Sequence, residues 1–139
     1  MRLDDLLATA EARITRLSPA ETHAAASAGA LIVDIRDDGA RQRDGVVPGS
    51  LHVPRTVLEW RLEPGGRWRN PNVEPDRWIV VLCEHGYSST LAAATLVELG
   101  YARVADVKGG FEAWQAAGLP VERARPRPPA TLPGMGGPD

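Results

Sequence analysis

The residues that could do chemistry gather in one short segment, residues 83–89, with the sequence CEHGYSS. An apolar run at 78–82 precedes this segment and predicts a buried strand. An alanine- and leucine-rich stretch at 90–99 follows it and predicts a helix. Cys83, the one cysteine of the chain, would therefore lie in a turn between the end of a strand and the start of a helix. A thiol held in such a turn is a candidate nucleophile.

The turn after Cys83 is suited to binding an anion. Gly86 can adopt backbone conformations that other residues avoid, and Ser88 and Ser89 are good residues for starting a helix. Backbone N–H groups of such a turn can point inward, and with the helix dipole they favour a thiolate over a thiol. The same groups, with the two serine hydroxyls, could hold an incoming anion or the outer sulfur of a persulfide. A lone cysteine is more often a small buried side chain than a nucleophile. The prediction that Cys83 is reactive therefore rests on its position between a strand and a glycine-containing turn.

The elements that must position this turn alternate between strands and helices. We expect strands at 14–17, 31–35, 51–54, 78–82 and 103–107, and helices at 3–14, 18–29, 56–62, 90–99 and 111–117. Residues 37–49 read as a polar loop with at most one helical turn. This alternation predicts an α/β fold with a parallel sheet covered on both faces. Ligands of such sheets bind beyond the carboxyl ends of the strands, where Cys83 is expected.

The composition limits the number of domains and the classes of function that the chain can have. The 139 residues suffice for one domain, which we place at 1–123, followed by a Pro/Gly-rich tail at 124–139 that we expect to be disordered. A net charge of −2 argues against nucleic-acid binding, and no apolar run reaches membrane-spanning length.

One cysteine can form neither an internal disulfide nor a cysteine-based zinc site, which suggests a reducing cytoplasm. The acids Asp4 and Asp5 lie where an export signal needs apolar residues. The three histidines are not spaced as a metal site, and His52, in an apolar strand, is expected to pack in the core.

Two chemistries use a turn of this kind. Cysteine-dependent phosphatases need an arginine six residues after the cysteine to grip phosphate in a bidentate way. That position is Ser89, and the residue before it, Ser88, is not arginine either. Sulfur transfer has a smaller group to hold, so the residues favour it over phosphatase or arsenate reductase chemistry.

Four patches of the sequence, in order, resemble the single-domain rhodaneses. They are LIVDIR at 31–36, GVVPGSLHVP at 45–54, CEHGYSS at 83–89 and GGFEAWQAAGLP at 109–120. The resemblance spans about residues 13–122 and implies a five-stranded parallel sheet with helices on both faces. It also implies a sulfurtransferase that takes sulfur from thiosulfate or a similar donor as a Cys83 persulfide. The acceptor would be a small thiol or a protein such as thioredoxin, and no metal or organic cofactor would be needed.

The resemblance and the turn together give a set of candidate site residues. Cys83 is the expected nucleophile, and Asp34 is expected to support the turn. The residues expected to bind substrate are Glu84, His85, Gly86, Tyr87, Ser88, Ser89 and Arg36. For Asp34 and Arg36 the residues favour the alternative of a structural salt bridge or loop anchor at a strand end. Many family members carry a cation at the position of Ser88, so His85 or Arg36 would have to supply positive charge here. The alternative from another class is a rhodanese-like module that binds a partner or senses redox state without turnover.

Overall fold

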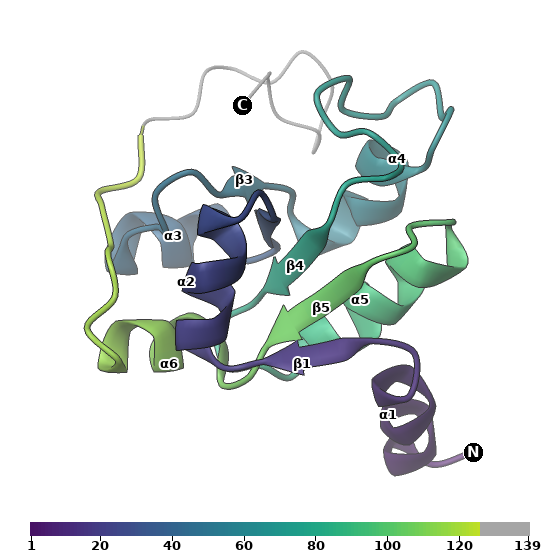
Figure 1. Cartoon of the computed structure of the whole chain (residues 1–139), viewed down its shortest axis with the longest axis horizontal. Helices are drawn as coiled ribbons and strands as arrows, with labels where there is room; N and C mark the ends of the chain where they lie inside the picture. The colour runs from purple at the N-terminus through teal and green to yellow at the C-terminus, as the bar shows by residue number, and fades with distance from the viewer. Residues whose placement is uncertain (126–139) are drawn as a thin grey trace.

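The computed structural model of the protein describes residues 1–125. Along the chain it contains α1 (Leu3–Glu11), β1 (Thr15–Leu17), α2 (Pro19–Ser27), β2 (Leu31–Asp34), α3 (Asp38–Asp44), β3 (Leu51–His52), the 3₁₀ turn η1 (Arg55–Val57), α4 (Leu58–Leu62), β4 (Ile79–Leu82), α5 (Ser88–Glu98), β5 (Val104–Val107) and α6 (Gly110–Ala116) (Figure 1). None of these helices is long and apolar enough to cross a membrane.

The five strands form one parallel sheet in the order β1-β5-β4-β2-β3. β4 lies at the centre, and all four of its residues are buried. Helices α1, α4 and α5 pack on one side of this sheet, and α2 and α6 pack on the other. The expected α/β fold, with a five-stranded parallel sheet and helices on both faces, is confirmed.

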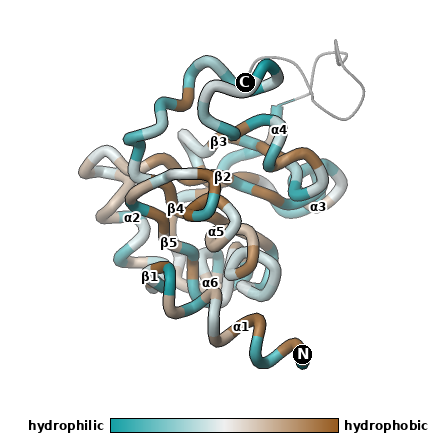
Figure 2. Tube along the Cα trace, turned by 90° about the vertical axis from the view of Figure 1, so that its right-hand side faces the viewer, coloured by the Kyte–Doolittle hydropathy of each residue, from teal (hydrophilic) through white to brown (hydrophobic). Residues whose placement is uncertain are grey.

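Alternate side chains of β4 enter two separate cores. Ile79 and Val81 join the core under α4 and α5, whereas Val80 and Leu82 join the core under α2 and α6. Apolar residues accordingly concentrate along the central strands in Figure 2. Trp114 is fully buried in the second core, and its indole N–H donates to the Pro120 carbonyl at 2.9 Å. A strand buried on both faces holds its last residue and the turn that follows it in a fixed place.

The segment at 37–49 differs from the expectation of a polar loop with at most one helical turn. It contains the seven-residue helix α3, whose start is capped by Asp37, which accepts from the Ala40 N–H at 2.7 Å. The sequence pattern did not predict this helix, because Gly39 and the two aspartates inside it are poor formers of helix interiors. The start of α2 carries a capping box, in which the Ser18 and Glu21 side chains each accept from the other's backbone N–H.

The chain stays in contact with the domain slightly beyond residue 123. Glu122 pairs with Val46 in an antiparallel bridge, and Ala124 is 3% exposed. Residues 126–139, which make up most of the expected tail, lie outside the described residues.

Candidate active site around Cys83

Cys83 lies at the carboxyl end of β4, and its sulfur faces the turn that leads into α5. The side chain is buried, and the Gly86 N–H donates to the sulfur at 3.1 Å. Gly86 has a φ of +83°, a left-handed conformation that turns its N–H back toward the sulfur. No atom within residues 1–125 accepts a hydrogen bond from the N–H groups of Tyr87, Ser88 or Ser89. These backbone donors are therefore available to an anion beside the sulfur.

Gly110, the first residue of α6, lets that helix press against the turn. The Phe111 N–H donates to the Cys83 carbonyl at 2.8 Å, and the Glu112 N–H donates to the Glu84 carbonyl at 3.0 Å. A Cβ on Gly110 would collide with the backbone of Cys83 and lie 2.7 Å from the Glu84 carbonyl carbon. The turn is thus clamped to α6 by backbone contacts that only glycine permits at this position.

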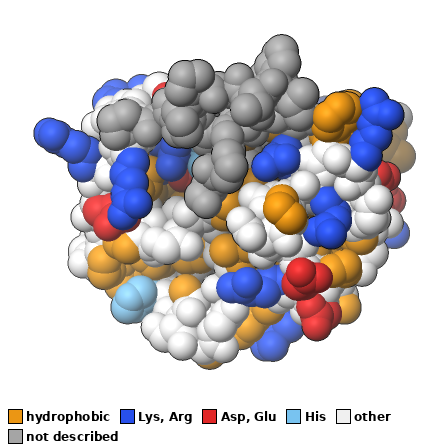
Figure 3. All heavy atoms as spheres, turned by 90° about the horizontal axis from the view of Figure 1, so that it is seen from above, with side chains coloured by type: hydrophobic (Ala, Val, Ile, Leu, Met, Phe, Trp, Pro, Cys, Tyr) orange, Lys and Arg blue, Asp and Glu red, His pale blue; other side chains and the backbone are white. Residues whose placement is uncertain are grey.

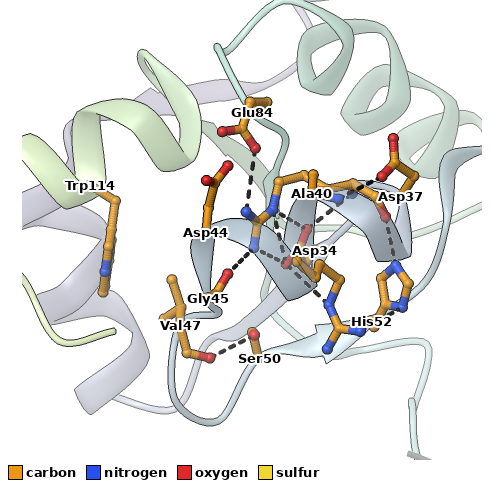
Figure 4. A network of polar contacts seen from close by, with 12 residues as sticks. Asp34, Asp37, Ala40, Asp44, Gly45, Val47, Ser50, His52, Glu84 and Trp114 are labelled. Carbon is orange, nitrogen blue, oxygen red and sulfur yellow. Dashed lines mark hydrogen bonds and ion pairs between the residues drawn. The ribbon is translucent and has the colours of Figure 1, made fainter. Parts of the chain in front are cut away.

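Arg36 and Asp34 form a buried ion pair, and Arg36 also reaches Glu84 of the turn; Figure 4 shows Asp34 and Glu84 in this polar network. The Arg36 guanidinium donates to both Asp34 oxygens, at 2.9–3.3 Å, and to the Gly45 carbonyl at 2.8 Å. It also reaches the Glu84 carboxylate at 3.3 Å and stacks over the Phe111 ring at 3.9 Å. Its side chain is only 1% exposed. Burial by itself would lower the pKa of Arg36. The hydrogen bonds to Asp34 and Glu84, together with the negative charges of these carboxylates, have the larger combined effect and raise this pKa.

Glu84, His85 and Tyr87 line the outer rim of the turn. Glu84 is partly exposed and held by Arg36. The His85 Nδ1 lies 2.8 Å from the Glu112 carboxylate, and both side chains are more than half exposed. Tyr87 is 79% exposed, and its ring centre lies 6.2 Å from that of His85. The rim therefore carries two carboxylates and one histidine.

The two serines of the turn differ in their surroundings. Ser88 is exposed. Ser89 is fully buried, and its hydroxyl donates to Asp106 at 2.8 Å. Its hydroxyl hydrogen is therefore directed at a carboxylate of the protein rather than toward a bound anion, which differs from the expectation.

Two residues of this region were missed by sequence reasoning. Arg16, on the edge strand β1, donates to both oxygens of Asp106 on β5 at 3.0 and 3.2 Å. Arg16 also donates to the Gly86 carbonyl at 3.1 Å. The sequence offers one signal for this pair, which is the position of Asp106 inside the apolar strand at 103–107. A carboxylate buried in such a strand requires a hydrogen-bonding or charged partner.

His52 packs beside this region, as expected. It is buried, its Nδ1 accepts from Arg41 at 3.1 Å, and its Nε2 lies 2.6 Å from the Arg36 carbonyl (Figure 4). Because Arg41 can only donate, the ring carries its proton on Nε2. His52 thus supports the segment that carries Arg36.

On the face shown in Figure 3, basic side chains are interspersed with acidic and hydrophobic ones across the described part of the surface. No continuous basic stripe is visible among the described residues on that face.

Known proteins resemble this chain in both sequence and fold. The sequence model of the family described as rhodanese-like domain matches residues 18–117 of this chain. The chain is 38% identical to thiosulfate sulfurtransferase GlpE of Actinobacillus pleuropneumoniae over 96 residues, which cover 69% of this chain and 81% of that protein. It is 37% identical to the protein of the same name from Stutzerimonas stutzeri over 100 residues, which cover 72% of this chain and 84% of that protein.

Two solved structures share the fold. One, from Rhodopseudomonas palustris, is a protein of unknown function described as a possible tyrosine phosphatase; the TM-score is 0.81 at 35% identity, covering 88% of this chain and 95% of that one. The other is the polysulfide-sulfur transferase homodimer of Wolinella succinogenes, with a TM-score of 0.68 at 26% identity, covering 85% of each chain. The named sulfurtransferases among these relatives confirm the class of enzyme expected from the sequence. The chain belongs to the rhodanese-like domain family.

Proposed function

We propose that this sulfurtransferase carries a sulfane sulfur as a persulfide on Cys83. The observation that supports this most is the Gly86 N–H on the Cys83 sulfur, next to three N–H groups with no acceptor within residues 1–125. We expect these donors to stabilise a second sulfur that is bonded to Cys83 and carries negative charge.

The donor we propose is thiosulfate, the donor in the names of the bacterial relatives. The Cys83 thiolate attacks the outer sulfur of thiosulfate and forms a new S–S bond. The S–S bond within thiosulfate breaks, and its electron pair leaves with sulfite. The total charge of −3 is the same on both sides, so no oxidant or reductant is needed.

An acceptor then removes the outer sulfur and restores the Cys83 thiolate. In vitro, cyanide can act as this acceptor, because it takes the neutral sulfur atom and becomes thiocyanate. In the cell we propose a thiol acceptor, either a small molecule or a protein such as thioredoxin. A reducing compartment such as the cytoplasm suits this chemistry, because the single free cysteine stays unoxidised there.

Within the turn we propose a division of roles. Tyr87 and Ser88 contribute backbone N–H groups to the outer sulfur, and His85 meets the donor at the rim. Arg36, one of the residues expected to bind substrate, is better suited to position Glu84 and the turn. Its 1% exposure and its bonds to Asp34, Glu84 and Gly45 support this role.

A steady-state experiment tests the proposal. Thiocyanate formation at varied thiosulfate and cyanide should give parallel double-reciprocal lines, the sign of a two-step transfer, and Cys83→Ser should give none. Intersecting lines, or turnover by Cys83→Ser, would contradict a persulfide on Cys83. Hydrolysis of an aryl phosphate by the wild-type chain would instead favour the phosphatase alternative, whose arginine position is occupied by Ser89.

A further inference from the structure

Asp106 is a buried carboxylate at the centre of a polar network that the transfer chemistry above does not use. Its side chain is 0% exposed, and it accepts bonds from Ser89 at 2.8 Å and Thr90 at 3.1 Å. The Arg16 guanidinium adds two more bonds and the compensating charge. A carboxylate is buried at low cost only when it is paired and bonded in this way. The network joins β5 and the edge strand β1 to the first turn of α5.

Arg16 extends this network to the turn around Cys83. One of its terminal nitrogens, Nη2, bonds Asp106 and also donates to the Gly86 carbonyl at 3.1 Å. The structure contains no cis peptide within residues 1–125, so the Gly86 carbonyl and the Tyr87 N–H of the same peptide point in opposite directions. Fixing that carbonyl on Arg16 therefore directs the Tyr87 N–H away from Arg16, on the opposite side of the peptide.

We propose that Arg16 and Asp106 are positioning residues that hold the Gly86–Tyr87 peptide in the orientation needed to bind the transferred sulfur. The inference deepens the proposed function and rests on it for the turnover measurement. Asp106 orients Arg16, Arg16 holds the Gly86 carbonyl, and the Tyr87 N–H is left for the outer sulfur of the persulfide.

The charges around the turn support this assignment. Arg36 is directed at Asp34 and Glu84, and the Nδ1 atom of His85, on the rim, lies beside the Glu112 carboxylate. Arg16 is 28% exposed, so its charge is only partly screened by solvent. The Asp106 hydrogen bond raises the pKa of Arg16 against the effect of burial, and the charges of Asp106, Glu11 and Cys83 add to the rise. Gly86 links Arg16 to the reacting sulfur, because its carbonyl accepts from Arg16 and its N–H donates to the Cys83 sulfur.

Four variants separate positioning from stability. Arg16→Gln removes the charge and the bond to Gly86. Arg16→Lys keeps the charge but cannot hold Asp106 and Gly86 together as a guanidinium does. The double variant Arg16→Gln with Asp106→Asn removes both charges, so no carboxylate is left buried and unpaired. Arg13→Gln is the matched control, because Arg13 lies just before β1 and pairs with Glu98 on the surface.

Two readouts are needed, thiosulfate:cyanide turnover and alkylation of Cys83 by neutral iodoacetamide and anionic iodoacetate. Arg16→Gln and the double variant should lower kcat roughly 10- to 100-fold, the range for a misplaced or missing donor, with a smaller change in KM. Both variants should slow the alkylation of Cys83 by iodoacetate more than its alkylation by iodoacetamide. Arg16→Lys should recover part of kcat, and Arg13→Gln should match the wild type.

The inference is overturned if the folded double variant keeps the wild-type kcat and the wild-type ratio of the two alkylation rates. The double variant keeps this test decisive even if Arg16→Gln alone unfolds. Absence of turnover in the wild type would instead contradict the proposed function, while the alkylation ratios would still test the positioning role of Arg16.

Discussion

The α-carbon of Gly110 lies so close to the Cys83 carbonyl that no Cβ fits between them. Gly110 also has a φ of +62°, which L side chains rarely adopt. Through this contact the start of α6 fixes the backbone of the nucleophile and of Glu84 after it. The geometry of the reactive sulfur thus depends on a residue 27 positions later in the chain.

Gly110→Ala is expected to displace the turn and to destabilise the domain. Strain at a positive φ together with a backbone collision should lower the free energy of unfolding by roughly 2–4 kcal/mol and reduce turnover at least tenfold. The matched control is Gly118→Ala, whose φ is +72° but whose Cβ would meet no atom within 4 Å. The control should cost about 1–2 kcal/mol and leave turnover intact. Equal losses of turnover in both variants would contradict the clamp.

The buried pair of Asp34 and Arg36 gives a second prediction. Asp34→Asn leaves a guanidinium that is 1% exposed without its nearest counter-charge, which should lower the free energy of unfolding by about 3–5 kcal/mol. Urea denaturation measures this loss. Glu98→Gln breaks the surface pair with Arg13 and should change stability by less than about 1 kcal/mol. A loss no larger than that control would show that Arg36 finds other compensation.

Tyr101 should make the domain sensitive to alkali. Its hydroxyl donates to the Leu62 carbonyl at 2.6 Å, and burial raises its pKa, with opposing smaller effects of Arg69 and Glu74. Below about pH 10 the tyrosine is protonated in both folded and unfolded chains, so its contribution is fully present. Above about pH 10 the unfolded chain loses the proton first, and stability falls as pH rises toward the folded pKa.

The variant Tyr101→Phe tests this pH dependence. It should be less stable by about 1 kcal/mol at neutral pH, because the Leu62 carbonyl loses its donor. Its free energy of unfolding should then decline less steeply than that of the wild type between pH 9 and pH 11 (about one unit either side of an ordinary tyrosine pKa). Parallel declines in the two proteins would assign the alkaline loss to other groups.

His85 and Glu112 should have opposite effects on the donor. Glu112 holds His85 at 2.8 Å and adds negative charge to the rim. Removing it in Glu112→Gln should therefore lower KM for thiosulfate, about two- to fivefold for an exposed charge pair, whereas His85→Ala should raise KM by a similar factor. Steady-state kinetics at low salt measures both. Changes of the same sign would contradict a role for His85 at the rim.

Much of the fold could be predicted from local sequence patterns. The apolar runs at 31–35, 78–82 and 103–107 specify buried strands, and Ser18 with Glu21 specifies a helix start. The turn around Cys83 could be predicted because all its residues are consecutive. Helix α3 could not be predicted, because its stability comes from an Asp37 cap and from packing rather than from helix propensity.

The parts of the site that were missed depend on contacts between distant residues. Arg16 and Asp106 are 90 positions apart and meet because β1 and β5 are neighbours in the sheet. For Arg36 the sequence leaves open a substrate contact or a salt bridge at a strand end, because its partners Gly45, Glu84 and Phe111 come from three other segments. Only the assembled fold shows that these partners surround its guanidinium.

The central claim is that Cys83 carries the sulfur, and intact mass tests it most directly. The purified protein is measured before and after thiosulfate, with and without cyanide, beside Cys83→Ser. A gain of about 32 daltons (one sulfur) in the wild type alone, removed by cyanide, is the result predicted for an activated thiolate. No gain in a wild type whose Cys83 still reacts with iodoacetamide, or an equal gain in Cys83→Ser, would contradict it.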